Sequence, residues 1–433
     1  MPIRFMHLAD IHLGYEQYGL SQRYNDFYQS FERAISDALA EGVDFVIIAG
    51  DLFHQRTIGP QTLLQAAHEL DRLRQAGIPC LVVMGNHERA HYRERLSWLD
   101  YLDGRGLLTV LSARYDKEGA LQVTPRGEDG GTYVDIGPAR IYGLPYAGST
   151  TPRLIADFAA HLAQTDRGRR PAFTILVAHA GLEGVLPNFT AHLTFEQLAP
   201  LRPYIDYVAM GHVHKRFERE AWVYNPGSLE PVSLTEADER GGGYLVEVSA
   251  NGVPARVQHR TYYRRPFVRL PIKISGCERP EQIYDVVERR LAEQLAGPIP
   301  PFSEPPIVDV SLECILQFDK QAIDMDHLQS MIKTALKPLW TRVRLLATAA
   351  DLHADELTGA LNRAELEHQV LTSLLAGDGR YRERAGDWAQ LLAETKRLAL
   401  EKSDPSIILD HLRAGIGRIG GGAGQGRDAN HSR

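Results

Sequence analysis

Short apolar runs alternate with helical patterns along the N-terminal part of the chain. Ile3–Leu8, Phe45–Ile48 and Leu81–Met84 are rich in β-branched residues and end near turn residues, as is typical of buried strands. Between these runs, apolar residues recur at the spacing of amphipathic helices, which Gly42 and Gly77 would close. The recurring positions are Phe27, Phe31, Ala34, Ile35, Ala38 and Leu39, followed by Leu63, Leu64, Ala67, Leu70 and Leu73. The alternation predicts parallel strands joined by right-handed crossovers.

Beyond residue 105 the pattern becomes richer in strands and turns. Further short apolar runs are separated by clusters of glycine, proline and aspartate. These runs are Arg140–Leu144, Phe173–Val177, Tyr207–Met210 and Gly243–Val248. Asn225-Pro226-Gly227-Ser228 is expected to form a tight turn between two of them. The pattern therefore predicts an α/β domain over residues 1–265.

Three further regions follow this domain. Residues 266–348 have the order strand, helix, strand, helix, strand and carry no cluster of metal-ligand side chains, so we expect a smaller α+β unit that shapes or contacts the substrate. Residues 349–414 are helical, with apolar stripes at Leu366–Leu375 and Trp388–Leu398. These stripes either pack back on the preceding domain or are covered by a partner. Residues 415–433 are glycine-rich and polar, and we expect them to be disordered.

Five of the apolar runs end, within a residue or two, on side-chain types that bind metal ions. Ligand sites in open α/β sheets lie beyond the carboxyl ends of the strands, so we expect one sheet to gather these side chains at a single edge. The candidates are Asp10, His12, Asp51, Asn86, His87, His179, His212 and His214. The pattern therefore predicts a site for a pair of metal ions.

Each part of this pattern also has a structural explanation. Asp10 and Asn86 are common turn residues, and a single histidine such as His179 is more often structural than a ligand. His212 and His214 share one side of an extended segment, a spacing that can chelate a metal but also arises by chance. Because such residues follow five separate apolar runs, the joint pattern favours the metal site.

The types of side chain restrict the metal and its chemistry. Carboxylate, carboxamide and imidazole groups without a thiolate suit Mn, Fe or Zn. Asp51 is the best candidate for a bridging ligand, because it follows a central strand of the pattern. His87 directly follows Asn86 and could orient a phosphate or protonate its leaving oxygen. His54 lies in the same loop as Asp51 and could act likewise, or it could be a simple surface residue.

The composition is that of an ordinary globular protein. A chain of 433 residues with 44% hydrophobic and 24% charged residues is expected to form two or three domains. No apolar stretch approaches the roughly 20 residues that span a bilayer, and no signal-peptide layout precedes the first strand. Cys80, Cys277 and Cys314 are far apart and are expected to be reduced thiols. We therefore expect a cytoplasmic protein without membrane contact.

The net charge of −7 weighs mildly against a partner that is a polyanion. Two divalent ions would add positive charge at the site, and contact with nucleic acid requires only a local basic patch. Candidate patches, each of which could equally be a solvated surface cluster, are Arg89-Arg93-Arg95, Arg167-Arg169-Arg170, Lys215-Arg216 and Arg264-Arg265.

The strand-end motifs closely resemble those of the SbcD-type, or meiotic-recombination, DNA double-strand-break repair nucleases in the calcineurin-like metallophosphoesterase superfamily. The resemblance is carried by Ala9-Asp10-Ile11-His12-Leu13-Gly14-Tyr15-Glu16-Gln17, Gly50-Asp51-Leu52-Phe53-His54 and Gly85-Asn86-His87. The histidine motifs and Asn225-Pro226-Gly227-Ser228 extend it to about residue 230. It implies a four-layer α/β fold, a metallophosphoesterase β-sandwich flanked by helices, with a smaller α+β capping domain and C-terminal helices. Glu88 stands where the family often has Asp, but this is not a ligand position.

The resemblance also implies the roles of individual residues. One Mn ion would be held by Asp10, His12, Asp51 and His214. The other would be held by Asp51, Asn86, His179 and His212. Mg, Fe or Zn are possible substitutes for Mn. His87 and His54 would act on the phosphate, and Tyr15, Arg56 and Arg89 would contact the substrate.

The activity implied by the resemblance is Mn-dependent cleavage of DNA ends, as a 3′-to-5′ exonuclease on duplexes and an endonuclease on single strands. The implied partner is a coiled-coil ATPase of the SbcC type, gripped by the C-terminal helices. The nuclease would form a homodimer near its N-terminal helices. Its expected location is the cytoplasm, in association with the nucleoid.

Two classes of function compete with this interpretation: another enzyme of the same superfamily and a non-enzymatic scaffold. A protein phosphatase of the same fold would carry Asp-Arg-Gly after the Gly-Asp loop, where this chain has His54-Gln55-Arg56. A small-molecule phosphodiesterase would not need the long capping and helical regions. A non-enzymatic scaffold would have lost ligands, and none is missing from the motifs. We therefore expect a two-metal phosphodiesterase that acts on DNA.

Overall fold

The chain divides into two compact units. The first comprises Met1–Leu270, Gly297–Asp309 and Ile332–Arg342, and the second comprises Pro271–Ala296, Val310–Met331 and Val343–Arg433. The computed structural model describes residues 2–89, 96–128, 130–165, 171–186, 193–249, 254–262, 264–296, 304–316, 318–349, 363–376, 381–401 and 404–420.

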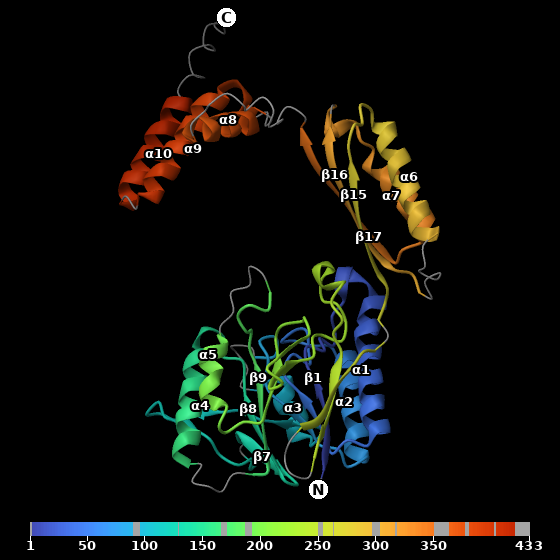
Figure 1. Cartoon of the computed structure of the whole chain (residues 1–433), viewed down its shortest axis with the longest axis vertical. Coiled ribbons are helices and arrows are strands. Elements are labelled where there is room, and N and C mark those ends of the chain that lie inside the picture. The colour runs from blue at the N-terminus through green and yellow to red at the C-terminus, as the bar shows by residue number, and fades with distance from the viewer. Residues whose placement is uncertain are drawn as a thin grey trace, which may run out of the picture. The chain divides into compact units, whose positions relative to one another are not determined.

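Two six-stranded sheets form the centre of the first unit (Figure 1). The first has the order β14-β13-β1-β2-β3-β4, and the second has the order β11-β12-β10-β9-β8-β7. The first sheet contains β1 (Ile3–Leu8), β2 (Phe45–Ile48), β3 (Cys80–Val82), β4 (Thr109–Val110), β13 (Gly243–Val248) and β14 (Pro254–Arg260). The second contains β7 (Tyr133–Ile136), β8 (Ala139–Leu144), β9 (Phe173–His179), β10 (Tyr207–Gly211), β11 (Phe217–Arg219) and β12 (Val223–Asn225). A separate ribbon pairs β5 (Arg114–Tyr115) with β6 (Leu121–Gln122).

The predicted parallel arrangement of the N-terminal strands is confirmed. Strands β1, β2, β3 and β4 pair in parallel, in that order. In the second sheet, β8, β9, β10 and β12 are also parallel. The remaining strands at the sheet edges, β13, β14, β7 and β11, pair antiparallel with their neighbours.

The central core lies between the facing sides of the two sheets. Phe5 of β1 pairs with Phe45 of β2, and their rings stack with centroids 5.1 Å apart. Tyr207 of the second sheet meets Phe5 edge-on, with centroids 5.3 Å apart. These side chains are fully buried, together with Phe173, Ile175 and Val246. The interdigitated side chains hold the two sheets face to face.

A buried histidine joins the two sheets within this apolar layer. His7 of β1 has Nδ1 at 3.1 Å from the hydroxyl of Tyr207 and Nε2 at 3.1 Å from the carbonyl oxygen of Met210. Burial lowers the pKa of His7 to about 3. The ring is therefore neutral near physiological pH and bonds to both partners without a buried charge.

Helices cover the outer faces of both sheets (Figure 1). The first sheet is covered by α1 (Ser21–Glu41), α2 (Pro60–Gln75) and α3 (Trp98–Gly104), and the second by α4 (Thr151–Thr165) and α5 (Phe195–Leu198). Phe31 and Leu70 pack with Met6 in the first outer core. Phe158 packs with Leu176 in the second. The predicted four-layer sandwich is therefore confirmed.

The strands that precede the candidate ligands are divided between the two sheets, so the expectation of a single sheet edge was wrong. Strands β1, β2 and β3 belong to the first sheet, whereas β9 and β10 belong to the second. All five strands are buried on both faces. Such strands lack the alternation of polar and apolar residues that would tell one sheet from two.

A buried ion network ties α1 to the segment that follows β14. Arg23 in α1 donates hydrogen bonds to Asp26 at 2.7 Å and to Glu230 at 2.9 Å. Arg265 donates two hydrogen bonds to the same Asp26, at 2.6 Å and 2.9 Å. Arg264 donates to the main-chain carbonyls of Leu229 and Ser228. Arg264-Arg265 is therefore a structural pair, with Arg265 buried and Arg264 half-buried, and not a basic surface patch.

A smaller α+β region follows, formed by a three-stranded sheet of order β15-β16-β17 and two helices. Its elements are β15 (Phe267–Ile274), α6 (Pro280–Ala296), β16 (Ile307–Leu316), α7 (Met325–Leu336) and β17 (Trp340–Ala349). Ile283 of α6, Val310 of β16 and Leu328 of α7 are buried. The predicted alternation of strands and helices in this region is thus confirmed.

Three helices complete the described chain: α8 (Arg363–Ala376), α9 (Ala385–Leu400) and α10 (Pro405–Gly420). α9 and α10 approach closely at Gly415, where an added Cβ would lie 2.2 Å from Leu391. The tail expected to be disordered from Gly415 instead remains helical to Gly420, and residues 421–433 lie outside the described residues. Within the described part of the chain, none of the helices combines the length and apolar character required to cross a membrane.

Replacing Arg23 with methionine should destabilise the first unit. Glu230 would lose the arginine that it pairs with, and Asp26 would keep only Arg265 of its two partners. Removing one partner of a buried ion pair lowers the free energy of unfolding by about 3–5 kcal/mol. Urea unfolding followed by tryptophan fluorescence would report the change as a lower midpoint. Arg140→Met is the control, because its partner Asp135 is 52% exposed and the loss should stay within about 1 kcal/mol. Equal effects of the two substitutions would contradict this role of the network.

Candidate metal centre

The loops after the strand ends adopt unusual backbone conformations. Asp10, His12, Asp51 and His212 have φ angles of 51°, 54°, 53° and 89°, in the left-handed region that favours glycine. Hydrogen bonds between loops hold this backbone: Asp10 N–H donates to Gly50 O, and His12 N–H donates to Asp51 O. Strained residues of this kind cluster at functional sites, and these four are all candidate metal ligands.

One group of donors combines residues from both sheets. The ligand atoms of Asp10, His12 and His214 lie within 4.8 Å of one another. Nε2 of His12 lies 3.1 Å from Nε2 of His214, which in turn lies 4.0 Å from a carboxylate oxygen of Asp10. Asp10 and His12 follow β1 and are fully buried, whereas His214 follows β10. Three predicted ligands from opposite ends of the first domain therefore converge.

A second group lies beside the first. The ligand atoms of Asp51, His179 and His212 also lie within 4.8 Å of one another, with Asp51 Oδ2 at 3.2 Å from His179 Nε2. The carboxamide oxygen of Asn86 joins them, at 3.1 Å from His179 Nε2 and 2.9 Å from His212 Nδ1. Asp51 also interacts electrostatically with Asp10 and His12 of the first group. This position suits a ligand shared by two ions.

His54 and His87 form a third cluster with His12, again within 4.8 Å. Nδ1 of His87 lies 2.6 Å from the main-chain oxygen of His54, and the main-chain N–H of His87 donates to Asp51 Oδ1 at 3.1 Å. The ring of Tyr15 stacks on His54 with centroids 3.7 Å apart. His54 is therefore half-buried within the cluster, and not isolated on the surface.

Two glycines allow the loops to approach the donors closely. Gly85, directly before Asn86, would place a Cβ 2.0 Å from Oδ1 of Asp51 and 2.6 Å from its main-chain nitrogen. Gly50 has φ +88°, and a Cβ there would lie 2.2 Å from Nδ1 of His179. Distances this short are not compatible with a side chain at either position. Only glycine fits at these positions of the Gly-Asp and Gly-Asn motifs, because any side chain would overlap Asp51 or His179.

Glu88 braces the loops, a role that the sequence did not reveal. It is 4% exposed, and its carboxylate accepts hydrogen bonds from the main-chain N–H groups of Gly85 at 3.0 Å, Asp51 at 3.1 Å and Phe53 at 3.0 Å. Burial raises the pKa of Glu88 to about 7, as does the neighbouring charge of Asp51. The only signal in the sequence was its position after Gly-Asn-His.

The turn at Asn225-Pro226-Gly227-Ser228 supports the loop of His214. Nδ2 of Asn225 donates to the carbonyls of Val213 at 2.5 Å and Lys215 at 3.1 Å. The main-chain N–H of Ser228 donates to the carbonyl of His214 at 3.1 Å. The predicted tight turn therefore also fixes a candidate ligand.

Burial and mutual charge shift the protonation of the donors. Burial raises the pKa of Asp10 to about 6, although His214 and His179 oppose the shift. Burial alone would lower the pKa of His179, but the negative charge of Asp51 outweighs burial and raises the pKa of His179 to about 9. Despite its own burial, Asp51 has a pKa far below the usual range because of His179. Burial lowers the pKa of His54 to about 4, so this ring is neutral near pH 7.

The predicted substrate contacts lie around this centre. Tyr15 stacks on His54, and Arg56 is exposed on the loop that follows β2. Arg89 is exposed and donates to the carbonyl of Tyr146 at 2.9 Å, with its guanidinium 5.2 Å from the Tyr146 ring. Sequence reasoning missed Tyr146, whose ring centroid lies 5.2 Å from that of His212.

The other predicted basic patches have mixed outcomes. Lys215 is paired with Glu239 at 3.0 Å, and Arg216 donates to the hydroxyl of Tyr244 at 3.2 Å. Both arginine-rich segments that would complete a larger patch lie outside the described residues; their members are Arg93, Arg95, Arg167, Arg169 and Arg170. Of the predicted patch Arg89-Arg93-Arg95, only Arg89 lies among the described residues.

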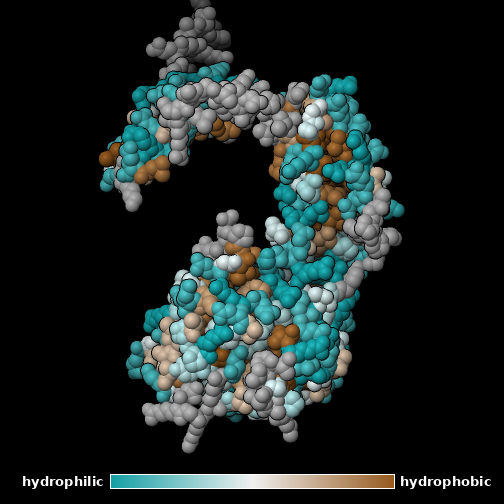
Figure 2. Space-filling model, viewed as in Figure 1, coloured by the Kyte–Doolittle hydropathy of each residue, from teal (hydrophilic) through white to brown (hydrophobic). Residues whose placement is uncertain are grey.

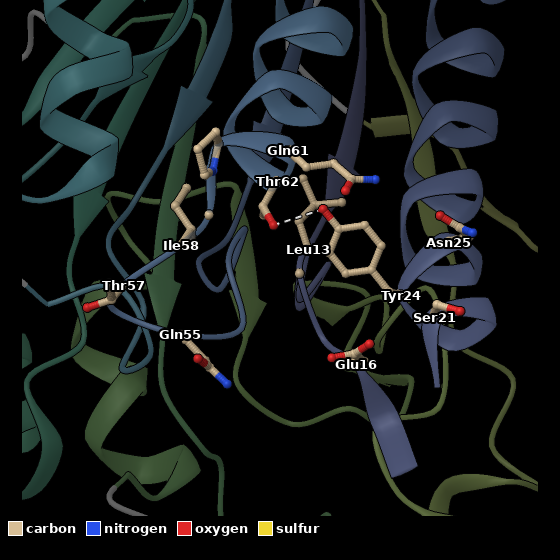
Figure 3. Close-up of a pocket in the computed structure, with 13 residues that line it drawn as sticks. Leu13, Glu16, Ser21, Tyr24, Asn25, Gln55, Thr57, Ile58, Gln61 and Thr62 are labelled. Atoms are coloured by element: carbon tan, nitrogen blue, oxygen red, sulfur yellow. Dashed lines mark hydrogen bonds between the residues drawn. The ribbon is translucent and has the colours of Figure 1, made fainter. Parts of the chain in front are cut away.

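A cavity of about 460 Å³ is lined by residues that neighbour Tyr15 and His54 in the sequence (Figure 3). Glu16 and Gln55, which directly follow those two residues, line it together with the beginnings of α1 and α2. The hydroxyl groups of Tyr24 and Thr62 are hydrogen-bonded across the cavity wall at 3.0 Å. The polar side chains that line the cavity carry mainly carboxamide and hydroxyl groups.

The donor set fits a pair of divalent ions. The atoms that converge are carboxylate and carboxamide oxygens and imidazole nitrogens, and the described free cysteines are not among them. Closely spaced imidazole nitrogens and buried carboxylates are satisfied together when cations lie between them. Such a pair would acidify water and stabilise negative charge on a phosphoryl group.

Comparison with known proteins agrees with this geometry. Residues 3–216 match the calcineurin-like phosphoesterase family. The DNA double-strand break repair protein Mre11 of Haloferax volcanii is 35% identical over 286 residues, which cover 65% of this chain and 57% of that protein. The protein of the same name from Halobacterium salinarum is 31% identical over 295 residues, which cover 66% of this chain and 67% of that protein.

The chain spans a smaller part of some other relatives. The chain covers 43% and 44% of the Mre11 proteins of Methanosarcina mazei and Methanosarcina acetivorans, so it spans about half the length of the first relatives that it matches. The crystal structure of the calcineurin-like phosphoesterase YfkN from Bacillus subtilis aligns with a TM-score of 0.36 and 12% identity, covering 68% of this chain and 98% of that one.

The substitution Gly85→Ala should disrupt the metal centre. The added methyl group would overlap Asp51, and either the carboxylate or the loop would have to move. We expect loss of Mn²⁺ binding in calorimetric titrations, with the fold retained by circular dichroism. Gly104→Ala is the control, because an added Cβ there meets nothing within 4 Å. Normal Mn²⁺ affinity in Gly85→Ala would contradict the close approach.

Mn²⁺ binding should strengthen as the pH rises towards 9. In the metal-free protein, His179 keeps its proton because Asp51 raises its pKa to about 9. A ligand must be deprotonated, so each displaced proton weakens binding about tenfold for every pH unit below that pKa. Calorimetry in buffers of different ionisation enthalpy would count the protons released. An affinity that does not change between about pH 6.5 and 9 would exclude a protonated His179 as the ligand.

Proposed function

Because the chain belongs to the Mre11 family of calcineurin-like phosphoesterases, we propose that it is a metal-dependent nuclease that processes DNA ends in double-strand-break repair. The observation that carries this proposal is the convergence of two donor groups around Asp51, with His87 bonded to the same carboxylate. In-line hydrolysis of a phosphodiester needs an activated water, a neutralised phosphoryl group and a proton donor for the leaving oxygen. The proposal assigns all three tasks to residues of this centre.

The proposed metal ligands form two sets that share Asp51. One set is Asp10, His12, Asp51 and His214, and the other is Asp51, Asn86, His179 and His212. We propose Mn²⁺ as the ion in both, because Mn accepts carboxylate oxygens together with imidazole nitrogens, with Mg, Fe or Zn as possible substitutes. The strained backbone at four of these residues would keep the donors in place before an ion arrives.

His87 is the proposed proton donor to the leaving oxygen. Its Nδ1 lies 2.6 Å from a main-chain carbonyl, which can only accept, so Nδ1 carries a hydrogen. Nε2 is then the atom that gives or takes a proton at the substrate. His54 is neutral at pH 7, because burial lowers its pKa, and it would orient the phosphate by hydrogen bonding.

DNA is the proposed substrate, cleaved 3′-to-5′ from duplex ends and internally in single strands. Arg89 and Arg56 are exposed near the centre and would contact backbone phosphates. Tyr15 would support His54 by stacking. The relatives named for double-strand-break repair favour DNA over a small phosphodiester. We propose that the protein acts inside the cell, in association with the nucleoid.

The regions after the nuclease domain are proposed to serve binding. We propose nuclease chemistry for residues 1–265, DNA contact for 266–348, and a partner site for 349–414, with an SbcC-type coiled-coil ATPase as the partner. Figure 2 shows hydrophobic patches on the helical segment. Among the described residues of α8, α9 and α10, the large apolar side chains that are exposed are Leu374, Leu392, Leu400, Ile407, Leu409 and Ile416. A homodimer near the N-terminal helices is proposed as well, supported by Leu64 of α2, which is 70% exposed.

The substitution His87→Ala should abolish cleavage but preserve metal binding. The main-chain N–H that bonds Asp51 is kept in alanine, whereas the proton donor is lost. We expect cleavage of end-labelled duplex and single-stranded DNA with Mn²⁺ to fall about 100- to 10,000-fold. Calorimetry should still find two bound Mn²⁺ ions.

His68→Ala is the matched control, because this histidine of α2 has a side chain that is 64% exposed. It should cleave DNA at the parental rate. Cleavage by His87→Ala at that rate would show that His87 is not the proton donor. Hydrolysis of bis(p-nitrophenyl) phosphate without any cleavage of DNA by the parental protein would instead exclude the nuclease assignment.

A further inference from the structure

The two ring nitrogens of His214 face different neighbours. Nε2 faces the first donor group, 3.1 Å from Nε2 of His12 and 4.0 Å from Oδ1 of Asp10. Nδ1 lies on the other side of the ring, 3.1 Å from Oε1 of Glu236. An imidazole that binds a metal through one nitrogen presents an N–H at the other, and a carboxylate that accepts this hydrogen fixes both the tautomer and the ring orientation.

Glu236 is held by its own loop. It ends a short 3-10 turn, Leu234–Glu236, and its side chain is 21% exposed. Oε2 accepts a hydrogen bond from the main-chain N–H of Val232 at 2.8 Å, and Oε1 also accepts one from the hydroxyl of Ser233 at 3.0 Å. These hydrogen bonds fix the position of the Glu236 carboxylate, and the carboxylate in turn orients the ring of His214.

The loop is in turn braced by a half-buried arginine. Arg264 donates from Nε to the carbonyl of Leu229 at 2.8 Å and from Nη2 to the carbonyl of Ser228 at 3.0 Å. Its Nη1 donates to the carbonyl of Glu239. One guanidinium thus clamps both ends of the segment that contains Glu236. The contact between Glu236 and His214 rests on a fixed support.

The second donor group is supported differently. Nδ1 of His179 lies 2.7 Å from the main-chain carbonyl of Ala49, a neutral acceptor at the end of a buried strand. Glu236 offers His214 a negative charge, which makes an imidazole a stronger ligand than a carbonyl does. His214 and His179 therefore differ in the acceptor that faces the second ring nitrogen: a side-chain carboxylate at His214 and a main-chain carbonyl at His179.

We infer that Glu236 is a positioning residue for the ion held by Asp10, His12, Asp51 and His214. This inference rests on the proposed function, because it takes that group to be a metal site. Glu236 orients His214 so that Nε2 points at the ion, and its charge strengthens that bond. Loss of the charge weakens one ion of the pair and leaves the ion at Asn86, His179 and His212 in place.

The test compares Mn²⁺ binding to the full-length protein and to Glu236→Gln, which keeps the size and one acceptor oxygen but not the charge. Calorimetric titration should resolve two ions in the parental protein. The variant should bind one ion with parental affinity and the other about 10- to 100-fold more weakly. Electron paramagnetic resonance gives a second readout, because the signal of a spin-coupled pair should be replaced by that of isolated Mn²⁺.

Glu239→Gln is the matched control. Glu239 lies in the same loop and pairs with Lys215 at 3.0 Å, so its variant should retain both ions and the coupled signal. Parental affinity for both ions in Glu236→Gln overturns the inference. Equal weakening of both ions also overturns it, because that result indicates general damage and not a role at one site. If the parental protein binds no pair of Mn²⁺ ions, the proposed function itself fails, and this inference with it.

Discussion

The metal centre depends on the packing of the two sheets against each other. Phe5 stacks on Phe45 and meets Tyr207 edge-on, and these buried rings fix the distance between the sheets. His7 adds hydrogen bonds that tie β1 to β10. Because loops that follow strands of both sheets converge, Asp10 and His214, far apart in the sequence, reach the same group of donors. Neither sheet alone could assemble the centre.

This packing also permits local strain. A non-glycine residue in the left-handed region costs of the order of 1–3 kcal/mol, and four candidate ligands adopt it. The cost is offset by hydrogen bonds that only the folded loops can make, including three from main-chain N–H groups to the buried carboxylate of Glu88. Glu88, Gly50 and Gly85 therefore matter as much to the geometry as the donors themselves, although none of them offers a ligand.

The sequence predicted the strands, the helices and the candidate metal ligands, but not the long-range contacts that join them. The strand Phe45–Ile48 has the predicted bounds, the helix around Phe31 is α1, and the predicted donors come together. The division into two sheets was missed, because strands buried on both faces carry no alternation. The contacts of Glu88, Tyr146 and Arg264 were missed as well. Each joins segments distant in the chain, and no local spacing records such a contact.

Protons and cations compete for the same positions in this centre. Without metal, the proton on His179 balances the charge of Asp51, and burial favours a protonated Asp10 below about pH 6. Below about pH 6, protons on His179 and Asp10 thus compensate both buried carboxylates. Since the sheets already hold the donors together, an ion needs only to replace these protons, without ordering the chain around itself. In such a centre, metal binding competes with protonation of the ligands and does not have to order the chain. This property suits a catalytic site more than a structural one.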